Sequence, residues 1–473
     1  MRRCRIIQGG MGVGVSGWRL ARAVSRLGQL GVVSGTGLAV VLARRLQDGD
    51  PDGDIRRAME HFPLPGVSQR VLKHYFVQGG KPKDRPYAST PIPQLELGVD
   101  LTELTVLSNF VEVFLAKEGH DGEVGINYLE KIQLPTLASL FGAMLAGVDV
   151  VLMGAGIPRS IPGAIDALAE GRAVEMRIDV SGAMPNDSYV SHFDPAAFCC
   201  GTAPKLRRPD FLAIVASATL ALTLARKSNG RVDGFVIEGP TAGGHNAPPR
   251  GTMQLNDRGE PVYGARDEVE LERFRELGLP FWLAGGFAQP GRLNDALAAG
   301  AQGVQVGTAF AFCEESGIAP EIKSLVLQAS REKTVRIRTD PLASPTGYPF
   351  KVVELAGTLA DPQVYGERVR LFDLGYLRHP YRKDDGTVGY RCPAEAIDQF
   401  THKGGDPLET AGRKCICNAL FGAIGMGQIH PAGHDEPPIV TAGDDVIHVS
   451  RFLQSGKDSY SASDVLERLL IGH

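Results

Sequence analysis

A glycine-rich turn that ends on a histidine is the feature of this sequence best suited to chemistry. The apolar run 232–238 stops at Gly239, and Ala242-Gly243-Gly244-His245 follows shortly after. In a parallel α/β protein the loop after a strand faces the ligand, and glycines let the backbone approach that ligand closely. An imidazole there can move a proton near neutral pH. We predict that Gly243 and Gly244 contact a ligand and that His245 is catalytic, in preference to a loop histidine that bonds only to backbone.

Two further turns downstream predict an anion site. Gly285 and Gly286 follow one apolar run, and Gln305-Val306-Gly307-Thr308 closes the next. Backbone N–H groups in such turns, just before a helix, favour an anion such as a phosphate. In parallel α/β barrels the turns after the seventh and eighth strands commonly form a phosphate site.

Two weaker motifs lie nearer the N-terminus. Gly9, Gly10 and Met11 follow the apolar pair Ile6-Ile7, so backbone amides there could reach a flat ring or a phosphate. An ordinary tight turn explains the same residues equally well. Asn127 ends another apolar run and could hydrogen-bond a ligand, although a strand-end asparagine is more often a turn former.

The elements that must position these residues alternate between buried strands and helices. Repeated strand–helix units imply a parallel sheet, and eight units favour a closed barrel over an open sheet. A Rossmann fold is disfavoured because the run 9–14 lacks a suitable acidic residue further along. We therefore predict an α/β fold, a (β/α)8 TIM barrel with insertions and a C-terminal extension. The predicted strands are 5–8, 30–34, 123–128, 148–154, 211–216, 232–238, 280–284 and 303–307.

The regular alternation is interrupted twice and ends near residue 335. We predict a barrel over 1–335 with insertions at about 36–105 and 173–210, the second carrying an extra strand at 173–180. Residues 336–473 are predicted to pack on the barrel as an extension. This extension should end in an amphipathic helix over 461–471, capped by Ser461 or Ser463.

Composition excludes several classes of protein. The formal net charge is −4 and no long basic run occurs, which disfavours nucleic acid as a partner. The apolar stretch 134–158 contains Pro135 and Asp149, so we predict a core helix and a buried strand rather than a membrane span. Seven cysteines in 473 residues do not form a disulfide scaffold. We expect a cytoplasmic protein with no membrane partner.

A metal site is considered at three cysteines of the extension. Cys392, Cys415 and Cys417 could bind zinc or part of an iron–sulfur cluster if His430 or His434 completed the set. Their spacing matches no metal motif, so we predict structural or redox-sensitive thiols and no metal.

Taken in order along residues 5–330, these motifs resemble the nitronate monooxygenase family, formerly called 2-nitropropane dioxygenase. The family is an FMN-dependent TIM barrel related to flavin-dependent enoyl-acyl-carrier-protein reductases. The resemblance implies that His245 holds the position of the family's catalytic histidine. It also implies FMN contacts at the glycine turns, at Asn127 and at Glu238, where the family usually has glutamine. The motifs that carry it are Ile6–Gly10, Gly125–Asn127, Gly239–His245, Ala284–Gly286 and Gln305–Thr308.

The implied activity is oxidation of alkyl nitronates with O2 to carbonyl compounds and nitrite. His245 would act as a base on a neutral nitroalkane or hold the nitronate's charge as an imidazolium. An ionised Glu238 would lower the flavin's potential. One alternative is an NAD(P)H-dependent reductase of quinones or enoyl thioesters, including the trans-acting type of polyunsaturated fatty acid synthesis; another is a non-catalytic flavin-binding protein. A small-molecule substrate, O2 or NAD(P)H as co-substrate and a possible homo-oligomer complete the expectations.

Overall fold

The computed structural model describes residues 4–430 and 433–471. Eight parallel strands form one sheet in the order β1-β10-β9-β8-β7-β4-β3-β2. The two end strands also meet, because the Gln8 amide donates to the Leu30 carbonyl at 2.9 Å and the Leu30 amide donates to the Ile6 carbonyl at 3.1 Å. The sheet therefore closes on itself, and the predicted (β/α)8 barrel is confirmed. The barrel strands are β1 (Ile6–Gln8), β2 (Gly31–Ser34), β3 (Val124–Leu129), β4 (Val150–Gly154), β7 (Asp210–Val215), β8 (Gly234–Glu238), β9 (Phe281–Ala284) and β10 (Gly303–Val306).

Side chains fill the barrel interior, so it is a packed core and not a channel. Ile7, Val32, Leu212 and Trp282 belong to one buried apolar cluster that spans strands around the barrel. The Trp282 indole satisfies its polar atom by donating to the Cys4 carbonyl at 3.1 Å. The continuous apolar runs predicted from the sequence arise because each strand is buried on both faces.

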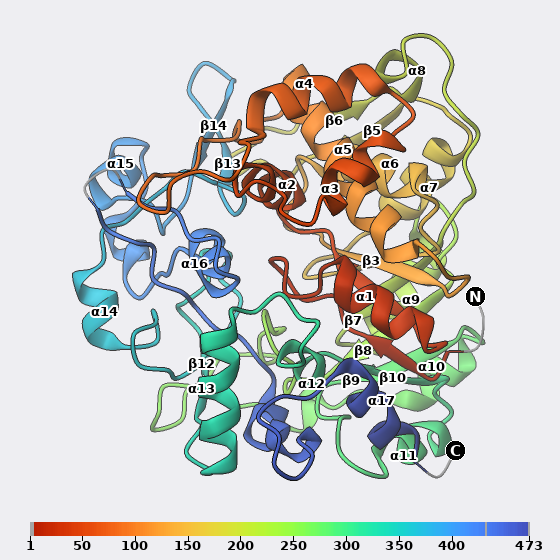
Figure 1. The fold of residues 1–473 in the computed structure, drawn as a ribbon, viewed down its shortest axis with the longest axis vertical. Helices are drawn as coiled ribbons and strands as arrows, with labels where there is room; N and C mark the ends of the chain where they lie inside the picture. Colours follow the sequence, from red (N-terminus) through yellow and green to blue (C-terminus); the bar gives the residue numbers. More distant parts are fainter. Residues whose placement is uncertain (1–3, 431–432, 472–473) are drawn as a thin grey trace.

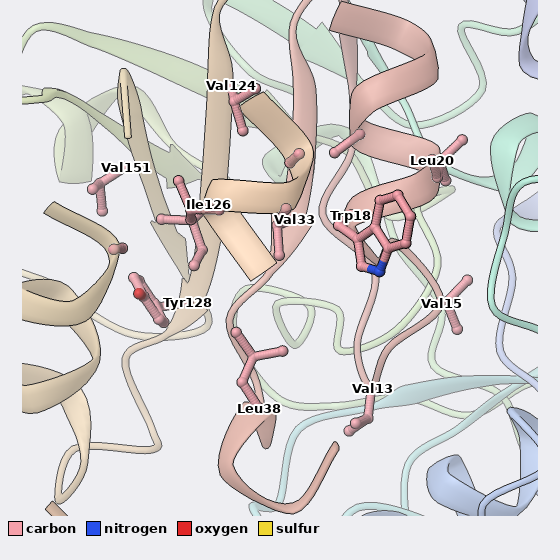
Figure 2. Packing of buried hydrophobic residues seen from close by; sticks show 14 of the residues in the cluster. Val13, Val15, Trp18, Leu20, Val33, Leu38, Val124, Ile126, Tyr128 and Val151 are labelled. Carbon is pink, nitrogen blue, oxygen red and sulfur yellow. The ribbon is translucent and has the colours of Figure 1, made fainter. Parts of the chain in front are cut away.

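Helices cover the outside of the barrel and share a second, larger core with it. Figure 2 shows Val33, Ile126 and Val151 from neighbouring strands packed on the same side as Trp18 and its helix. This burial fixes the strands whose ends carry the site. The surrounding helices are α1 (Trp18–Arg26), α6 (Thr136–Leu145), α7 (Ile161–Ala169), α9 (Ala218–Lys227), α10 (Leu271–Glu276), α11 (Arg292–Ala298), α12 (Thr308–Ala311) and α13 (Pro320–Arg331), with the 3-10 turn η1 (Ala265–Asp267) before α10.

Both predicted interruptions carry structure of their own. The stretch after β2 forms helices before an extended segment that contacts the C-terminal region, where the Leu95 amide donates to the Tyr390 hydroxyl at 2.6 Å. The extra strand predicted at 173–180 is present and pairs antiparallel with a second strand. These elements are α2 (Leu38–Gln47), α3 (Asp54–Glu60), α4 (Pro65–Tyr75), α5 (Val99–Lys117), β5 (Val174–Arg177), β6 (Val190–Phe193) and α8 (Pro195–Phe198).

Much of the C-terminal region lies against one side of the barrel. Figure 1 shows α14, α15 and α16 at the left of the molecule, while α7, α9 and α10 lie at the right. Val446 and Tyr460 share the main core with the barrel, whereas Leu359 and Ile439 belong to a smaller core of the region's own. The elements are β11 (Ile337–Asp340), β12 (Phe350–Val353), α14 (Pro362–Glu367), β13 (His379–Arg382), β14 (Val388–Arg391), α15 (Ile397–His402), η2 (Pro407–Thr410), α16 (Ile416–Ala423), η3 (Asp444–Phe452) and α17 (Ala462–Leu470).

Two smaller predictions are also confirmed. The N-cap of α17 is Ser461 rather than Ser463: its hydroxyl accepts from the Asp464 amide and the Asp464 carboxylate accepts from the Ser461 amide. The apolar stretch 134–158 forms α6 and β4, and no helix in the described part of the chain is long and apolar enough to cross a membrane. The proposed division of the chain at residue 335 stays a prediction.

Candidate functional site

One cavity of about 230 Å³ lies where the carboxyl ends of β1, β3, β8, β9 and β10 meet the C-terminal region. Every residue predicted to bind or react lines this cavity, although the residues come from distant parts of the sequence. The structure thus brings the predicted set together in one place. The set is Gly9, Gly10, Met11, Asn127, Glu238, Gly243, Gly244, His245, Gly285, Gly286, Gln305, Val306, Gly307 and Thr308.

The turn after β1 lies directly against Asn127. A Cβ atom on Gly10 would be only 2.3 Å from the Cβ of Asn127, so only glycine fits there. The amide Nδ2 of Asn127 donates to the Gly10 carbonyl at 3.4 Å, whereas its buried Oδ1 has no partner in the described structure. The buried Oε1 of Gln305 also has no partner. Two buried acceptors in one cavity favour a ligand that presents N–H donors, because an unpaired buried acceptor costs about 1–3 kcal/mol.

The turns after β9 and β10 give the cavity a wall of exposed backbone. Gly285 and Gly286 have φ of 92° and 73°, a left-handed conformation that favours glycine. A Cβ on Gly285 would also be 2.8 Å from the Thr241 hydroxyl oxygen. The hydroxyl of Thr308 is already engaged, since it accepts a hydrogen bond from the Gly443 amide at 2.8 Å. The sequence did not predict this use of Thr308 by the C-terminal region.

His245 is held by the C-terminal region and not by the barrel alone. Its Nε2 lies 2.7 Å from the Ser344 hydroxyl, and its ring packs edge-on against Phe350 with a centroid distance of 4.9 Å. Burial lowers the pKa of His245 to about 4, so the imidazole is neutral at physiological pH. This corrects the expectation of an imidazole that titrates near neutrality, and it disfavours the imidazolium considered from the sequence.

Glu238 ends β8 inside the same cavity. Burial raises the pKa of its carboxyl group to about 7, because few polar groups solvate the charged form there. A substantial fraction of Glu238 is therefore protonated at neutral pH, which weakens the argument for a fixed negative charge. Glu238 and Asp445 are the acidic residues among the lining residues, and the described lining contains no lysine or arginine.

A segment of the C-terminal region, 441–445, closes the cavity above the glycine turns. The Gly244 amide donates to the Thr441 hydroxyl at 2.9 Å, and the Asp444 amide donates to the Thr241 carbonyl at 3.0 Å. A Cβ on Gly243 would be 2.7 Å from the carbonyl carbon of Ala442, so this turn must stay bare to let the segment approach. No periodicity in the sequence marked this segment as part of the site.

The C-terminal region also contributes apolar side chains to the cavity wall. They come from β12, from the loop before β13 and from α16, and Phe350 among them packs against His245. These side chains suit an alkyl or other apolar group of a substrate. These residues, which sequence reasoning missed, are Phe350, Tyr376, Leu377, Ile416, Cys417, Leu420 and Phe421.

The three cysteines of the extension form an apolar cluster. Cys392 and Cys415 are buried together and Cys417 packs against them, and burial raises the pKa of Cys392 to about 12. Within residues 4–430 and 433–471 no group of three or more His, Cys, Asp or Glu residues is arranged to hold a metal ion. His430 and His434 lie with their ring centroids 6.5 Å apart.

Comparison with known proteins supports the family assignment. Residues 203–341 match the nitronate monooxygenase family model. A probable nitronate monooxygenase of Bacillus subtilis is 36% identical over 103 residues, which is 22% of this chain and 28% of that protein. An octahydro-indene carboxyl-CoA dehydrogenase of Mycobacterium tuberculosis is 31% identical over 141 residues, which is 30% of this chain and 34% of that protein. The chain thus matches about a third of the length of these relatives.

Among solved structures, FabK from Thermotoga maritima aligns with 99% of this chain and 92% of its own, at 16% identity and a TM-score of 0.49. The family segment contains β8, β9 and β10 with their turns, and therefore His245 and both glycine turns. Gly10 and Asn127 lie outside it, and only the fold brings them to the same cavity.

Proposed function

We propose that the protein is an FMN-dependent oxidoreductase that oxidises alkyl nitronates with O2 to carbonyl compounds and nitrite. The observation that carries the proposal is the convergence of the family segment's turns with Gly10 and Asn127 on one cavity. The segment 203–341 brings the family's chemistry into consideration, and the strands outside the segment complete a site for a flat, phosphorylated ligand.

The residues present fit FMN. The isoalloxazine ring carries an N–H donor and carbonyl acceptors, which suits the two unpaired amide oxygens of Asn127 and Gln305. The bare backbone at Gly9 and Gly10 would hold the ring, and the amides at Gly286, Gly307 and Thr308 would hold the phosphate. Bound FMN would supply the two-electron redox chemistry, which no side chain of the cavity can supply.

The cavity's own residues then select and orient the substrate. His245 is neutral, so it can hydrogen-bond a nitronate oxygen without bringing a charge. The apolar wall beside it, from Phe350 to Phe421, accepts the alkyl group and excludes water. O2 is small enough to need no dedicated polar site.

A reductase of enoyl thioesters is the second candidate function. The same neutral imidazole could polarise a thioester carbonyl. The Mycobacterium tuberculosis relative is named as a carboxyl-CoA dehydrogenase, and a CoA ester is a thioester. NADH or NADPH would then be the co-substrate in place of O2. The sequence contains no separate dinucleotide motif, and a shared flavin face would not require one.

Anaerobic stopped-flow absorbance separates the two functions. Purified protein loaded with FMN is mixed separately with propyl nitronate, NADH and NADPH, and bleaching of the flavin band is followed. Bleaching by the nitronate but not by either nicotinamide supports the oxidising function. Bleaching by a nicotinamide alone overturns it in favour of the reductase, and a protein that binds no FMN overturns both.

A further inference from the structure

We infer that Ser344 and Thr346 fix the tautomer of His245 with the proton on Nδ1, so that its imidazole donates a hydrogen bond to a substrate oxygen instead of accepting a proton. The role of His245 toward a substrate rests on the function proposed above, whereas the tautomer itself does not. Ser344 and Thr346 are thus positioning residues, and both belong to the C-terminal region.

The loop between β11 and β12 places these hydroxyl groups. The strand that follows this loop, β12, runs beside the His245 loop. There the Lys351 amide donates to the Gly244 carbonyl at 2.9 Å, and the Asn246 amide donates to the Pro349 carbonyl at 2.9 Å. These two bonds bracket His245 and hold its ring at Ser344. The Ser344 side chain is fully buried, at 0% exposure. Its hydroxyl therefore exchanges hydrogen bonds only with protein groups.

The inferred tautomer is the one in which both hydroxyl protons of this chain have a protein acceptor. The Ser344 Oγ accepts one bond from the Thr346 amide at 3.2 Å and lies 2.8 Å from the Thr346 hydroxyl. Thr346 Oγ1 itself accepts from the Tyr348 amide at 3.4 Å. Within the described residues Ser344 Oγ is the one acceptor in reach of the Thr346 hydroxyl, and a bond from Thr346 fills both lone pairs of Ser344. The proton of Ser344 then points to its remaining neighbour, the Nε2 of His245 at 2.7 Å.

A neutral imidazole that accepts at Nε2 carries its proton on Nδ1. Burial lowers the pKa of His245 to about 4, which keeps the ring in this neutral form. Nδ1 has no hydrogen-bond partner in the part of the chain that the structure describes, and the residue lines the cavity. The acidic side chains of that cavity are Glu238 and Asp445, and neither forms an ion pair with the ring among the described residues. The Nδ1 proton is therefore available to a ligand.

The tautomer restricts the class of substrate. A donor at Nδ1 suits an oxygen that already carries negative charge or a carbonyl dipole, as in a nitronate or a thioester. It cannot abstract a carbon-bound proton, because its nitrogen lone pair is turned to Ser344. We therefore expect the protein to act on propyl nitronate and not on neutral nitropropane, from which a proton would first have to be removed.

Nitrogen-15 NMR of histidine-labelled, FMN-loaded protein tests the tautomer directly. The His245 signals are identified by their loss in His245→Gln, and the two ring nitrogens are told apart by their couplings to the ring protons. We expect the wild-type protein to show a protonated Nδ1 and an unprotonated Nε2. The reverse pattern, or a ring protonated on both nitrogens at neutral pH, would overturn the inference.

Two variants separate the hydroxyl chain from general packing. Thr346→Val removes the hydroxyl at nearly constant volume and should mix the two tautomers, whereas Thr346→Ser keeps the hydroxyl and should preserve the wild-type spectrum. Ser344→Ala should lower kcat/KM for propyl nitronate by about ten-fold, the effect of about one hydrogen bond, while Thr346→Ser retains activity. A wild-type ring spectrum in Ser344→Ala would refute the positioning role.

The outcomes also distinguish this inference from the proposed function. An Nδ1 proton in a protein that turns over no nitronate leaves the tautomer standing and removes the proposed reaction. If the protein turns over propyl nitronate while the His245 ring is protonated at Nε2, the proposed reaction stands and the inferred tautomer is wrong. Equal turnover of nitropropane and propyl nitronate would contradict the restriction on substrate class.

Discussion

Replacing Gly10 by alanine tests the close contact between Gly10 and Asn127 in the cavity wall. The new Cβ would be 2.3 Å from the Cβ of Asn127 and 3.1 Å from Cγ1 of Val32. Neither atom can move away without a shift of β2 or β3, because both side chains belong to residues in buried strands. Overpacking of this kind costs about 1–3 kcal/mol. The unfolding entropy of a chain this long is roughly 1 kcal/mol per kelvin, so the melting temperature of the apoprotein should fall by about 1–3 °C.

The same displacement should disturb the unpaired Asn127 amide and weaken FMN binding. A loss of about 1–3 kcal/mol corresponds to roughly a 5- to 150-fold higher Kd, measured by fluorescence titration of the apoprotein. Gly9→Ala is the matched control for stability, since its Cβ would lie 3.4 Å from Cγ of Gln305, an ordinary contact. If Gly10→Ala matched the wild-type protein in both melting temperature and FMN affinity, the reasoning from close approach would be refuted.

Four further predictions concern charge and the loop that carries His245. Burial raises the pKa of Glu238 from 4.5 to about 7. The stability that its proton contributes is therefore present below pH 4.5 and is lost as the pH rises to 7. Glu238→Gln should lack this loss in thermal melts. The pKa of His245 falls from 6.5 to about 4, so the wild-type protein should lose stability as the pH drops through that window, and identical acid profiles of wild type and His245→Gln would contradict this. His245→Ala should lower kcat/KM for propyl nitronate about ten- to hundred-fold, the loss of a hydrogen bond to a charged oxygen. Thr441→Val should cost about 1–3 kcal/mol, because it leaves the Gly244 amide without its acceptor, whereas Thr441→Ser should melt like the wild-type protein.

The barrel could be predicted from the sequence because its strands are buried on both faces. Such strands are short apolar runs bounded by glycine, and the structure moves their predicted ends by only one or two residues. The predicted strand 232–238 begins at Gly234, and just before it the Asp233 carboxylate accepts bonds from the Arg208 guanidinium and the Phe211 amide. Hydropathy does not reveal such side-chain partners at a strand end.

The glycine turns could be predicted because local geometry demands glycine. Gly285 and Gly286 have a left-handed backbone conformation, which favours glycine, and the sequence has glycine at both positions. The protonation of His245 could not be predicted, because burial by Phe350 and Ser344 depends on residues about a hundred positions away. Those residues lie in a Pro- and Gly-rich region without strand or helix periodicity, so no pattern links them to the barrel.

The contacts between barrel and C-terminal region suggest where specificity resides in this architecture. The three loops after β8, β9 and β10 are each held by this region: Gly244 by Thr441, Ala288 by Asp445 and Thr308 by Gly443. The proposed FMN contacts depend mostly on backbone in these loops, so side-chain changes in the C-terminal region can leave them intact. The apolar side chains from Phe350 to Phe421 and the hydroxyl groups of Ser344 and Thr346, in contrast, belong to the C-terminal region. Substitutions there should therefore change which substrate is oxidised, or which nitrogen of His245 meets it, without first abolishing flavin binding.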